Sequence, residues 1–187
     1  MCIRDRQSKK LIHVSNLFNI KNQQVLANKL CKISGMNSAF FCNSGSEANE
    51  TALKLARLHA NNKKLKNPKI IIFDKSWHGR TIATLSATGN KSVQAGFKPL
   101  IGGFVKCQLN DIKTVKKVIN NNNVSAVILE TIQGEGGIRI AEDKFLKEVR
   151  KITSQKDILL IVDEVQTGMG RTGTVSYTHL RAHETAA

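Results

Sequence analysis

Hydrophobic residues fall into two kinds of segment along the chain. Some form continuous runs of strand length, whereas others recur every three or four residues, as on one face of a helix. The continuous runs are residues 39–42, 70–73, 124–129 and 158–162. The periodic segments predict amphipathic helices that follow Ser46, Asp111 and Asp143. Strands that alternate with helices predict an α/β fold with a mostly parallel sheet and helices on both faces.

Polar segments follow these runs, at or just beyond the positions where the strands are expected to end. They are residues 43–50, 77–81, 130–137 and 163–168. The carboxyl ends of parallel strands lie at one edge of a sheet, and ligands bind beyond that edge. We therefore expect the four segments to contribute to one binding site.

The apolar run 158–162 is followed directly by an acid, Asp163. A strand that is apolar on both faces is buried, and a carboxylate beside it is unfavourable unless a cationic group neutralises it. A ligand with a protonated heteroaromatic nitrogen, such as a pyridinium cofactor, would supply that charge. The alternative is that Asp163 pairs with a nearby lysine or arginine, or caps the following turn.

Segment 43–50 joins an expected strand to an expected helix, so free backbone amides at the helix start would point outward with the positive end of the helix dipole. Gly45 would let an anion approach closely, and the Ser46 hydroxyl would add a donor, which indicates a phosphate site. The segment lacks the Gly-Lys-Ser/Thr sequence of a nucleotide P-loop. The alternative is an ordinary helix cap in which Ser46 and Glu50 act locally.

Segment 77–81 places an aromatic ring, a glycine and a guanidinium group close together. Trp77 could stack on a planar ligand, and Arg80 could hold a carboxylate through two parallel hydrogen bonds. The alternatives are a partly buried core tryptophan, a histidine satisfied by the backbone, and a solvated arginine.

Two glycine-rich segments are less specific. Residues 130–137 contain two acids and three glycines, and the alternative to a ligand-binding loop is a solvated connection. Residues 168–173 match the Gly-x-Gly-x-x-Gly dinucleotide fingerprint. No apolar helix follows them, so we expect no nicotinamide or flavin site there.

The 187-residue chain is strongly basic, with a formal net charge of +15 and an isoelectric point near 9.9. Its lysines are scattered over the expected helix faces without interleaved aromatic residues, which argues against nucleic acid and favours small anionic partners. Apolar runs of about five or six residues are too short to span a membrane, and residues 1–10 lack the apolar centre of a secretory signal. Four cysteines without paired or metal-type spacing favour a cytoplasmic protein without a metal site.

Taken together and in this order, the polar segments resemble the class III (ornithine-type) pyridoxal-phosphate-dependent aminotransferases over residues 11–174. The blocks that carry the resemblance are His-Val-Ser-Asn-Leu-Phe at 13–18, Asn-Ser-Gly-Ser-Glu-Ala-Asn-Glu at 43–50, Trp-His-Gly-Arg-Thr at 77–81, Glu-Thr-Ile-Gln-Gly-Glu-Gly-Gly at 130–137 and Asp-Glu-Val-Gln-Thr-Gly at 163–168. The resemblance implies an incomplete large domain of the fold type I aminotransferases, with pyridoxal 5'-phosphate (PLP) as cofactor and a homodimer in the full-length protein.

The block at 13–18 favours the branch of this family that transfers the terminal amino group of N-acetylornithine to 2-oxoglutarate in arginine biosynthesis. The partners implied are therefore a small amino donor and a 2-oxo acid, with neither nucleic acid nor membrane. Ornithine, 4-aminobutyrate or succinylornithine as the donor remain alternatives, as does a noncatalytic basic binding domain.

The resemblance also implies roles for the candidate residues. Gly45 and Ser46 would bind the cofactor phosphate. Trp77 would cover one face of the pyridine ring and Val165 the other. The Trp77 position is commonly phenylalanine in the family, so the stacking role is retained.

Four further residues would act on the ring and the substrate. Asp163 would pair with the protonated ring nitrogen, and Gln166 would hydrogen-bond the ring oxygen. Arg80 would hold a substrate carboxylate, and Glu135 would pair with an arginine outside this chain.

The chain departs from the family pattern at its ends and at one chemical group. The family needs a lysine, beyond the strand that ends at Asp163, to form a Schiff base with the cofactor, and no lysine follows Asp163 here. We therefore assign no catalytic residue and expect this chain not to turn over substrate. Residues 1–8 and 175–187 do not continue the pattern, and we expect them to be non-native, with residues 9–174 as the partial cofactor domain.

Overall fold

The computed structural model describes residues 2–15 and 17–173, and the chain divides into two compact units, Met1–Phe40 and Phe41–Ala187. The first unit contains two helices, α1 (Ile3–Ser8) and α2 (Lys21–Ser34). No residue of either helix is buried, and Val25 of α2 is 59% exposed. These helices therefore do not form a hydrophobic core of their own.

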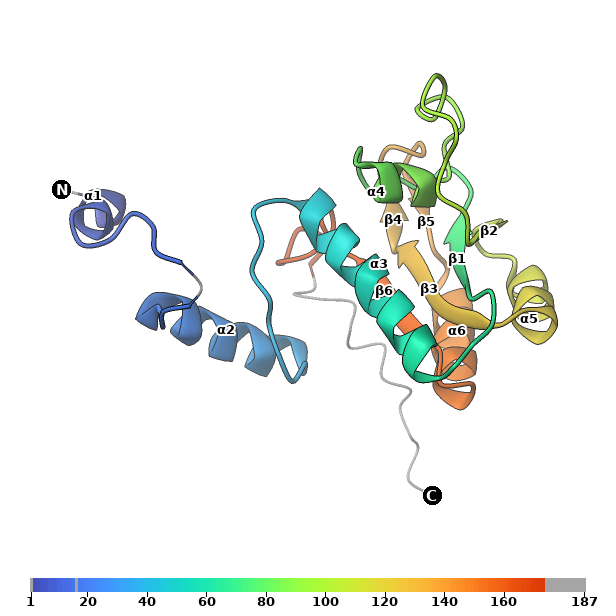
Figure 1. Cartoon of the computed structure of the whole chain (residues 1–187), viewed down its shortest axis with the longest axis horizontal. Coiled ribbons are helices and arrows are strands. Elements are labelled where there is room, and N and C mark those ends of the chain that lie inside the picture. The colour runs from blue at the N-terminus through green and yellow to red at the C-terminus, as the bar shows by residue number, and fades with distance from the viewer. Residues whose placement is uncertain (1, 16, 174–187) are drawn as a thin grey trace. The chain divides into compact units, whose positions relative to one another are not determined.

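The second unit is built on a four-stranded sheet with the strand order β2-β1-β3-β6, in which all neighbouring pairs are parallel (Figure 1). The strands are β1 (Lys69–Phe73), β2 (Phe104–Cys107), β3 (Val124–Glu130) and β6 (Leu159–Asp163). The central strand β3 is buried along its whole length, as expected for a continuous apolar run in a parallel sheet. The mostly parallel sheet predicted from the sequence is confirmed.

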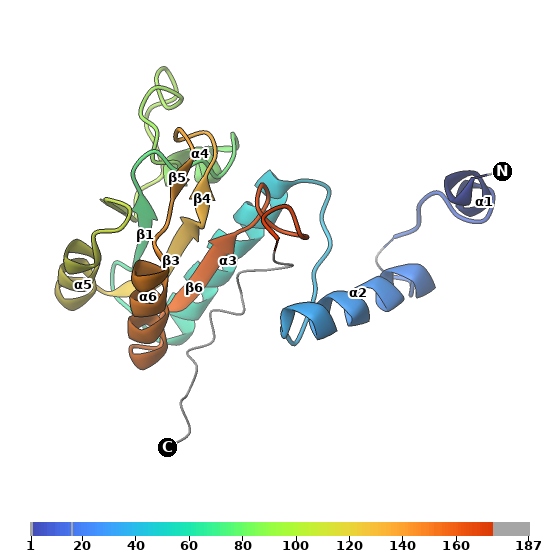
Figure 2. The same ribbon diagram turned by 180° about the vertical axis from the view of Figure 1, so that it is seen from behind.

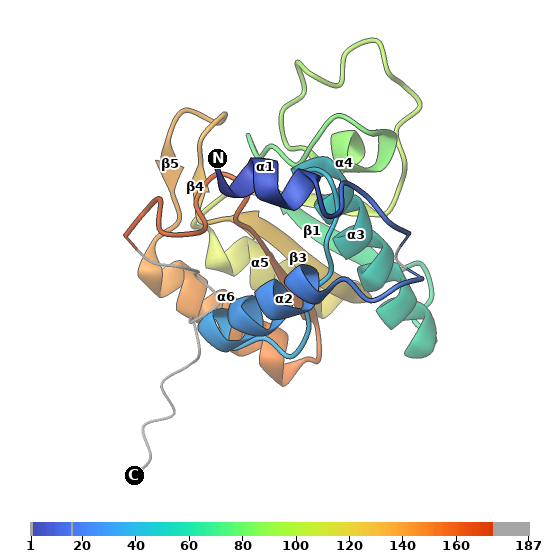
Figure 3. The same cartoon turned by 90° about the vertical axis from the view of Figure 1, so that its left-hand side faces the viewer.

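Helices cover both faces of this sheet. Helix α3 lies in front of it in Figure 1 and behind it in Figure 2. Helices α3 (Gly45–Asn62) and α4 (Ile82–Ala87) lie on one side in Figure 3, and α5 (Ile112–Asn121) and α6 (Asp143–Gln155) lie on the other. The three helices predicted after Ser46, Asp111 and Asp143 are confirmed as α3, α5 and α6.

Alternate residues of each strand supply the two hydrophobic cores. Ile70 and Ile72 of β1 pack in the cluster that contains residues of α3 and α4, whereas Ile71 and Phe73 pack in the cluster that contains residues of α5 and α6. The Phe73 ring meets Phe145 of α6 edge to face, with the ring centroids 5.6 Å apart. This two-residue period, buried on both faces, fixes the sheet and therefore the position of its carboxyl edge.

The structure corrects the sequence prediction in three places. Residues 39–42 are not a strand, because no strand among the described residues pairs with them, and Phe40 is 72% exposed. Strand β2 was not predicted, because Lys106 interrupts its apolar run; the Lys106 ammonium instead donates to the Gly89 carbonyl oxygen at 3.0 Å. A short antiparallel pair, β4 (Ile132–Gln133) and β5 (Arg139–Ile140), lies where a loop was expected.

Within the described part of the chain, no helix has the length and apolar character needed to cross a bilayer. No group of three or more His, Cys, Asp or Glu side chains in the same residues could hold a metal ion. The four cysteines are free thiols, and Cys107 of β2 is buried, which raises the pKa of its thiol to about 11.

Candidate functional site

A cavity of about 240 Å³ lies beyond the carboxyl edge of the sheet, within the second unit. Its walls come from the start of α3, the loop after β1, the end of β3 and the end of β6. The lining residues are Ser44, Gly45, Ser46, Asn49, Trp77, His78, Gly79, Glu130, Asp163, Val165 and Gln166. Six of the eight site residues proposed from the sequence line it, whereas Arg80 and Glu135 do not.

The start of α3 presents free donors to this cavity. The Ser44 hydroxyl caps the helix by accepting a hydrogen bond from the Glu47 amide at 3.3 Å. The Glu47 carboxylate in turn accepts one from the Asn43 amide. These contacts leave the first two helical amides, those of Gly45 and Ser46, without an intrahelical acceptor. Capping is thus done by Ser44 and Glu47, and the local capping role considered for Ser46 is wrong.

Two glycines permit close packing around the cavity. A Cβ atom on Gly45 would lie 2.7 Å from a methyl carbon of Val165, so Val165 packs directly on the helix start. Gly79 has φ +133°, and a Cβ there would lie 2.5 Å from the Ser46 hydroxyl and 2.6 Å from that of Thr84. Both positions require the absence of a side chain, since there is no space for one.

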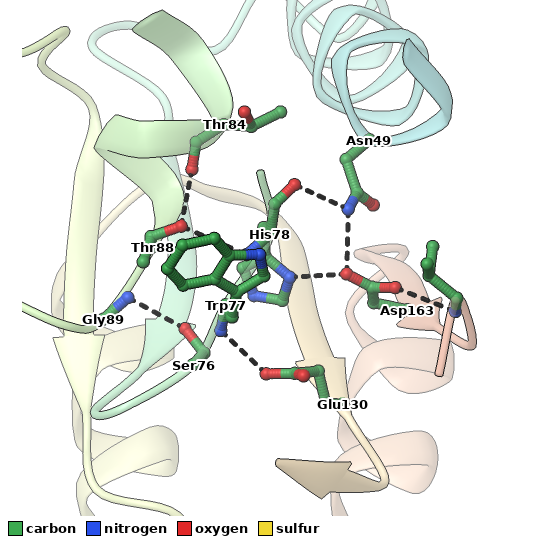
Figure 4. A network of polar contacts seen from close by, with 10 residues as sticks. Asn49, Ser76, Trp77, His78, Thr84, Thr88, Gly89, Glu130 and Asp163 are labelled. Atoms are coloured by element: carbon green, nitrogen blue, oxygen red, sulfur yellow. Dashed lines mark hydrogen bonds and ion pairs between the residues drawn. The ribbon is translucent and has the colours of Figure 1, made fainter. Parts of the chain in front are cut away.

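Asp163 is buried and accepts three hydrogen bonds, as Figure 4 shows. One carboxylate oxygen accepts from the Asn49 side chain at 2.8 Å and lies 2.8 Å from His78 Nδ1; the other accepts from the Val165 amide at 3.1 Å. Burial raises the pKa of Asp163, but the hydrogen bonds and the charge of His78 outweigh it, and the pKa is below its ordinary value. Asp163 is therefore an anion at neutral pH, and among the ion pairs of the described residues its partner is His78 and not a lysine or arginine.

His78 is one of the lining residues that reasoning from the sequence did not propose. Its ring is fully buried, with Nδ1 on Asp163 and with Nε2 lacking a hydrogen-bond partner within the described residues. Its backbone is held on both sides: the amide donates to the Thr88 hydroxyl at 3.1 Å, and the carbonyl accepts from Asn49 at 2.9 Å. The signal that could have identified it is its position directly after Trp77. The alternative of a histidine satisfied by the backbone does not hold for its ring, because Nδ1 contacts the Asp163 carboxylate.

Of the two candidate residues in segment 77–81, Trp77 lines the cavity and Arg80 does not. Trp77 is half-buried and lines the cavity. Arg80 is exposed, and its guanidinium lies 5.4 Å from the centroid of the Trp77 ring, in cation–π range.

Of the two acids in segment 130–137, the structure places Glu130 in the cavity and leaves Glu135 exposed outside its lining. Glu130 accepts a hydrogen bond from the Trp77 amide at 2.9 Å. Burial raises the pKa of Glu130 to about 7 and the charges of Asp163 and Glu135 add to that rise, whereas the Trp77 hydrogen bond and His78 oppose it. The sequence signal for Glu130 is its place as the last residue of β3, which matches that of Asp163 on β6.

The cavity combines three features that suit one kind of ligand. Free helix amides and a hydroxyl favour a phosphate at one side. The Asp163 carboxylate favours a cation, and Trp77 and Val165 provide apolar surface. A flat heteroaromatic ring that bears a phosphate and a basic nitrogen fits these donors, acceptors and walls.

The profile of the class-III aminotransferase family matches residues 2–185, and the chain belongs to that family. Among curated proteins, the acetylornithine aminotransferase of Nitrosomonas europaea is 51% identical to it over 168 residues, which are 89% of this chain and 43% of that protein. The acetylornithine aminotransferase of Prochlorococcus marinus subsp. pastoris is 48% identical over 173 residues, with 89% and 42% covered. The chain thus spans less than half the length of the curated relatives it matches.

Solved structures agree with this assignment. The ornithine aminotransferase of Toxoplasma gondii, whose structure holds PLP at partial occupancy in its active site, superposes with a TM-score of 0.86 at 31% identity, covering 91% of this chain and 41% of that one. The N-acetylornithine aminotransferase of Stenotrophomonas maltophilia superposes with a TM-score of 0.77 at 38% identity, covering 92% and 42%. The α/β fold predicted from the sequence is therefore confirmed, and it matches part of the fold of solved aminotransferases.

Proposed function

We propose that this chain is the cofactor-binding part of an acetylornithine aminotransferase, which transfers the terminal amino group of N-acetylornithine to 2-oxoglutarate. The identity of 51% to the Nitrosomonas enzyme supports the donor, and the cavity at Asp163 supports the cofactor PLP. PLP supplies an electron sink when it is bound in aminotransferases. The protein fold supplies the phosphate site, the counter-charge and the walls. We also propose that the full-length protein is a homodimer.

The cavity residues would hold PLP as follows. The amides of Gly45 and Ser46 and the Ser46 hydroxyl would bind the phosphate. Asp163, ionised at neutral pH and oriented by His78, would hold the proton on the ring nitrogen.

Trp77 would pack on one ring face and Val165 on the other, and Gln166 would hydrogen-bond the ring oxygen. Arg80 would hold a substrate carboxylate from its position beside the Trp77 ring, and Glu135 would pair with an arginine that this chain does not contain.

A second candidate is a class III aminotransferase with a different amino donor, such as ornithine. The Toxoplasma ornithine aminotransferase favours it, since its fold agrees with this chain at a TM-score of 0.86. Rates of the full-length protein on N-acetylornithine, ornithine, succinylornithine and 4-aminobutyrate would discriminate these donors. The proposal requires N-acetylornithine to give the highest kcat/KM.

The first prediction concerns how the 187-residue chain binds PLP. No lysine lines the cavity in the described part of the chain, so binding should be noncovalent. Added PLP is expected to quench the fluorescence of Trp77, the single tryptophan of the chain, and dialysis should restore it. Pyridoxal without its phosphate should quench much less. Absence of quenching, or cofactor fixed to a cavity peptide after borohydride treatment, would contradict this prediction.

The second prediction tests the phosphate site. Ser46→Ala removes a hydroxyl donor but leaves the helix amides in place, so the dissociation constant for PLP is expected to rise about tenfold. Ser154→Ala, on an exposed position of α6, is the matched control and should bind like the wild type. Fluorescence titration of both variants decides it, and equal affinities of the two variants would remove Ser46 from the phosphate site.

A further inference from the structure

A second acid, Glu130, lies beside Asp163 in the cavity, and the proposed function assigns it no contact with cofactor or substrate. It is the last residue of β3, and its register partner on the neighbouring parallel strand β6 is Asp163. Its side chain is buried, and it lines the cavity. Two carboxyl groups therefore end adjacent strands at the same edge of the sheet.

Glu130 also forms a hydrogen bond with the main chain of Trp77, which lines the cavity. A carboxyl oxygen accepts the hydrogen bond of the Trp77 amide at 2.9 Å, and the next amide, that of His78, donates to Thr88 (Figure 4). These two bonds hold the peptide groups on either side of the Trp77 Cα atom. An ionised carboxylate makes the stronger acceptor, because charge-assisted hydrogen bonds are roughly twice as strong as neutral ones. The placement of the Trp77 ring is thereby linked to the charge of Glu130.

Three titratable groups act on Glu130 from the elements packed around it. They are His78 in the loop after β1, Asp163 at the end of β6, and Glu135 in the loop after β4. Burial is the largest cause that raises the pKa of Glu130, to about 7; Asp163 and Glu135 add to the rise and His78 opposes it, whereas the pKa of Asp163 is below its ordinary value. Near neutral pH the cavity therefore passes from one carboxylate to two.

We propose, on the basis of the proposed function, that Glu130 is a positioning residue whose charge controls how tightly the cavity holds an aromatic ring with a protonated nitrogen. The ionised form adds a second negative charge next to Asp163 and fixes the main chain of Trp77. The protonated form removes that charge and weakens the hold on Trp77. Glu130 itself acts through Trp77 and through its field on His78 and Asp163.

The test compares the 187-residue chain with its Glu130→Gln variant, using pyridoxamine 5'-phosphate as the probe. Glutamine keeps the shape and can still accept from the Trp77 amide, but it cannot ionise. Trp77 fluorescence gives the dissociation constants between pH 6 and pH 8.5. The probe itself titrates in the same way with both proteins. The ratio of the variant's dissociation constant to that of the wild type therefore reports only the effect of Glu130. We expect this ratio to rise about tenfold across the range, with a midpoint near pH 7.

Glu142→Gln, an exposed acid before α6, is the matched control, and its ratio should stay near one at every pH. A purely structural role of Glu130 would instead change the affinity equally at all pH values. If both proteins bind the probe but the ratio is flat, the role of Glu130 is refuted and the proposed function stands. If neither protein binds while circular dichroism shows native helix content, the proposed function fails and this inference fails with it.

A measurement on the wild type alone covers the case in which Glu130→Gln does not fold. The emission of Trp77 in the unliganded chain is expected to shift with a midpoint near pH 7, since the bond to its amide changes strength there. Emission that is independent of pH between 6 and 8.5 would overturn the inference.

Discussion

Replacing Asp163 by asparagine is expected to weaken PLP binding by about 100-fold or more, which is the largest effect on affinity that we expect from one substitution. Asparagine has the same shape and can still accept from the Val165 amide, but it carries no charge to hold a protonated ring nitrogen. Losing the partner of a buried, hydrogen-bonded charge weakens binding by about 2–5 kcal/mol. The wild-type carboxylate is ionised throughout the neutral range, because its pKa is below the ordinary value. The loss should therefore be similar at pH 6 and pH 8.

Trp77 fluorescence titration measures this loss, and Asp143→Asn provides the matched control. Asp143 is an exposed carboxylate in the first turn of α6, so its variant should bind PLP like the wild type. Circular dichroism verifies that the Asp163→Asn protein is folded. A folded Asp163→Asn protein with wild-type affinity would show that Asp163 is not the counter-charge of the ligand.

The sheet could be predicted from the sequence wherever burial on both faces left an uninterrupted apolar run. Strands β1, β3 and β6 are of this kind, and their ends agree with the predicted runs to within about one residue. Strand β2 was missed because one of its four residues is a lysine that satisfies its charge through the Gly89 carbonyl oxygen. Residues 39–42 have the right composition for a strand, but a strand also needs a neighbour, and composition carries no information about that neighbour.

The sequence predicted those site residues that lie at or just after the end of a strand. Trp77 and Asp163 follow predicted strands that are present, and the structure gathers them in one cavity. Gly45 reaches the same cavity as the first residue of α3, although the strand expected before it is absent. The contacts of Asn49 and His78 with Asp163 could not be predicted, because they join positions 114 and 85 residues apart. Only the packing of α3 and the loop after β1 on β6 reveals them.

Arg80 and Glu135 show the opposite limit. Each belongs to a polar segment that does reach the cavity, but neither is among the residues that line it. A motif places a segment at the sheet edge, whereas the direction of each side chain depends on backbone turns that the motif does not specify. The roles proposed for them therefore depend on groups outside this chain. Arg80 would need a substrate carboxylate, and Glu135 would need an arginine that the chain does not contain.

Glu130→Gln is expected to stabilise the protein above neutral pH. In the folded state the pKa of Glu130 is about 7, compared with its ordinary value of 4.5. Between these values the folded protein keeps a proton that the unfolded chain loses, so the free energy of unfolding falls as the pH rises through this window. A difference of this size corresponds to about 3 kcal/mol at pH 8. Glutamine keeps the acceptor for the Trp77 amide without the buried charge, and it should restore most of that amount.

Urea unfolding at pH 4.5, 6 and 8 measures the difference. The variant and the wild type should have similar free energies of unfolding near pH 4.5, and the variant should be the more stable protein by an increasing margin at pH 6 and pH 8. Glu142→Gln should follow the wild type at each pH, because that acid is exposed. A Glu130→Gln protein that is less stable at pH 8 would show that the carboxylate makes a stabilising contact. A more stable variant that has lost the pH-dependent affinity would instead show that the acid is kept for binding, at the expense of stability.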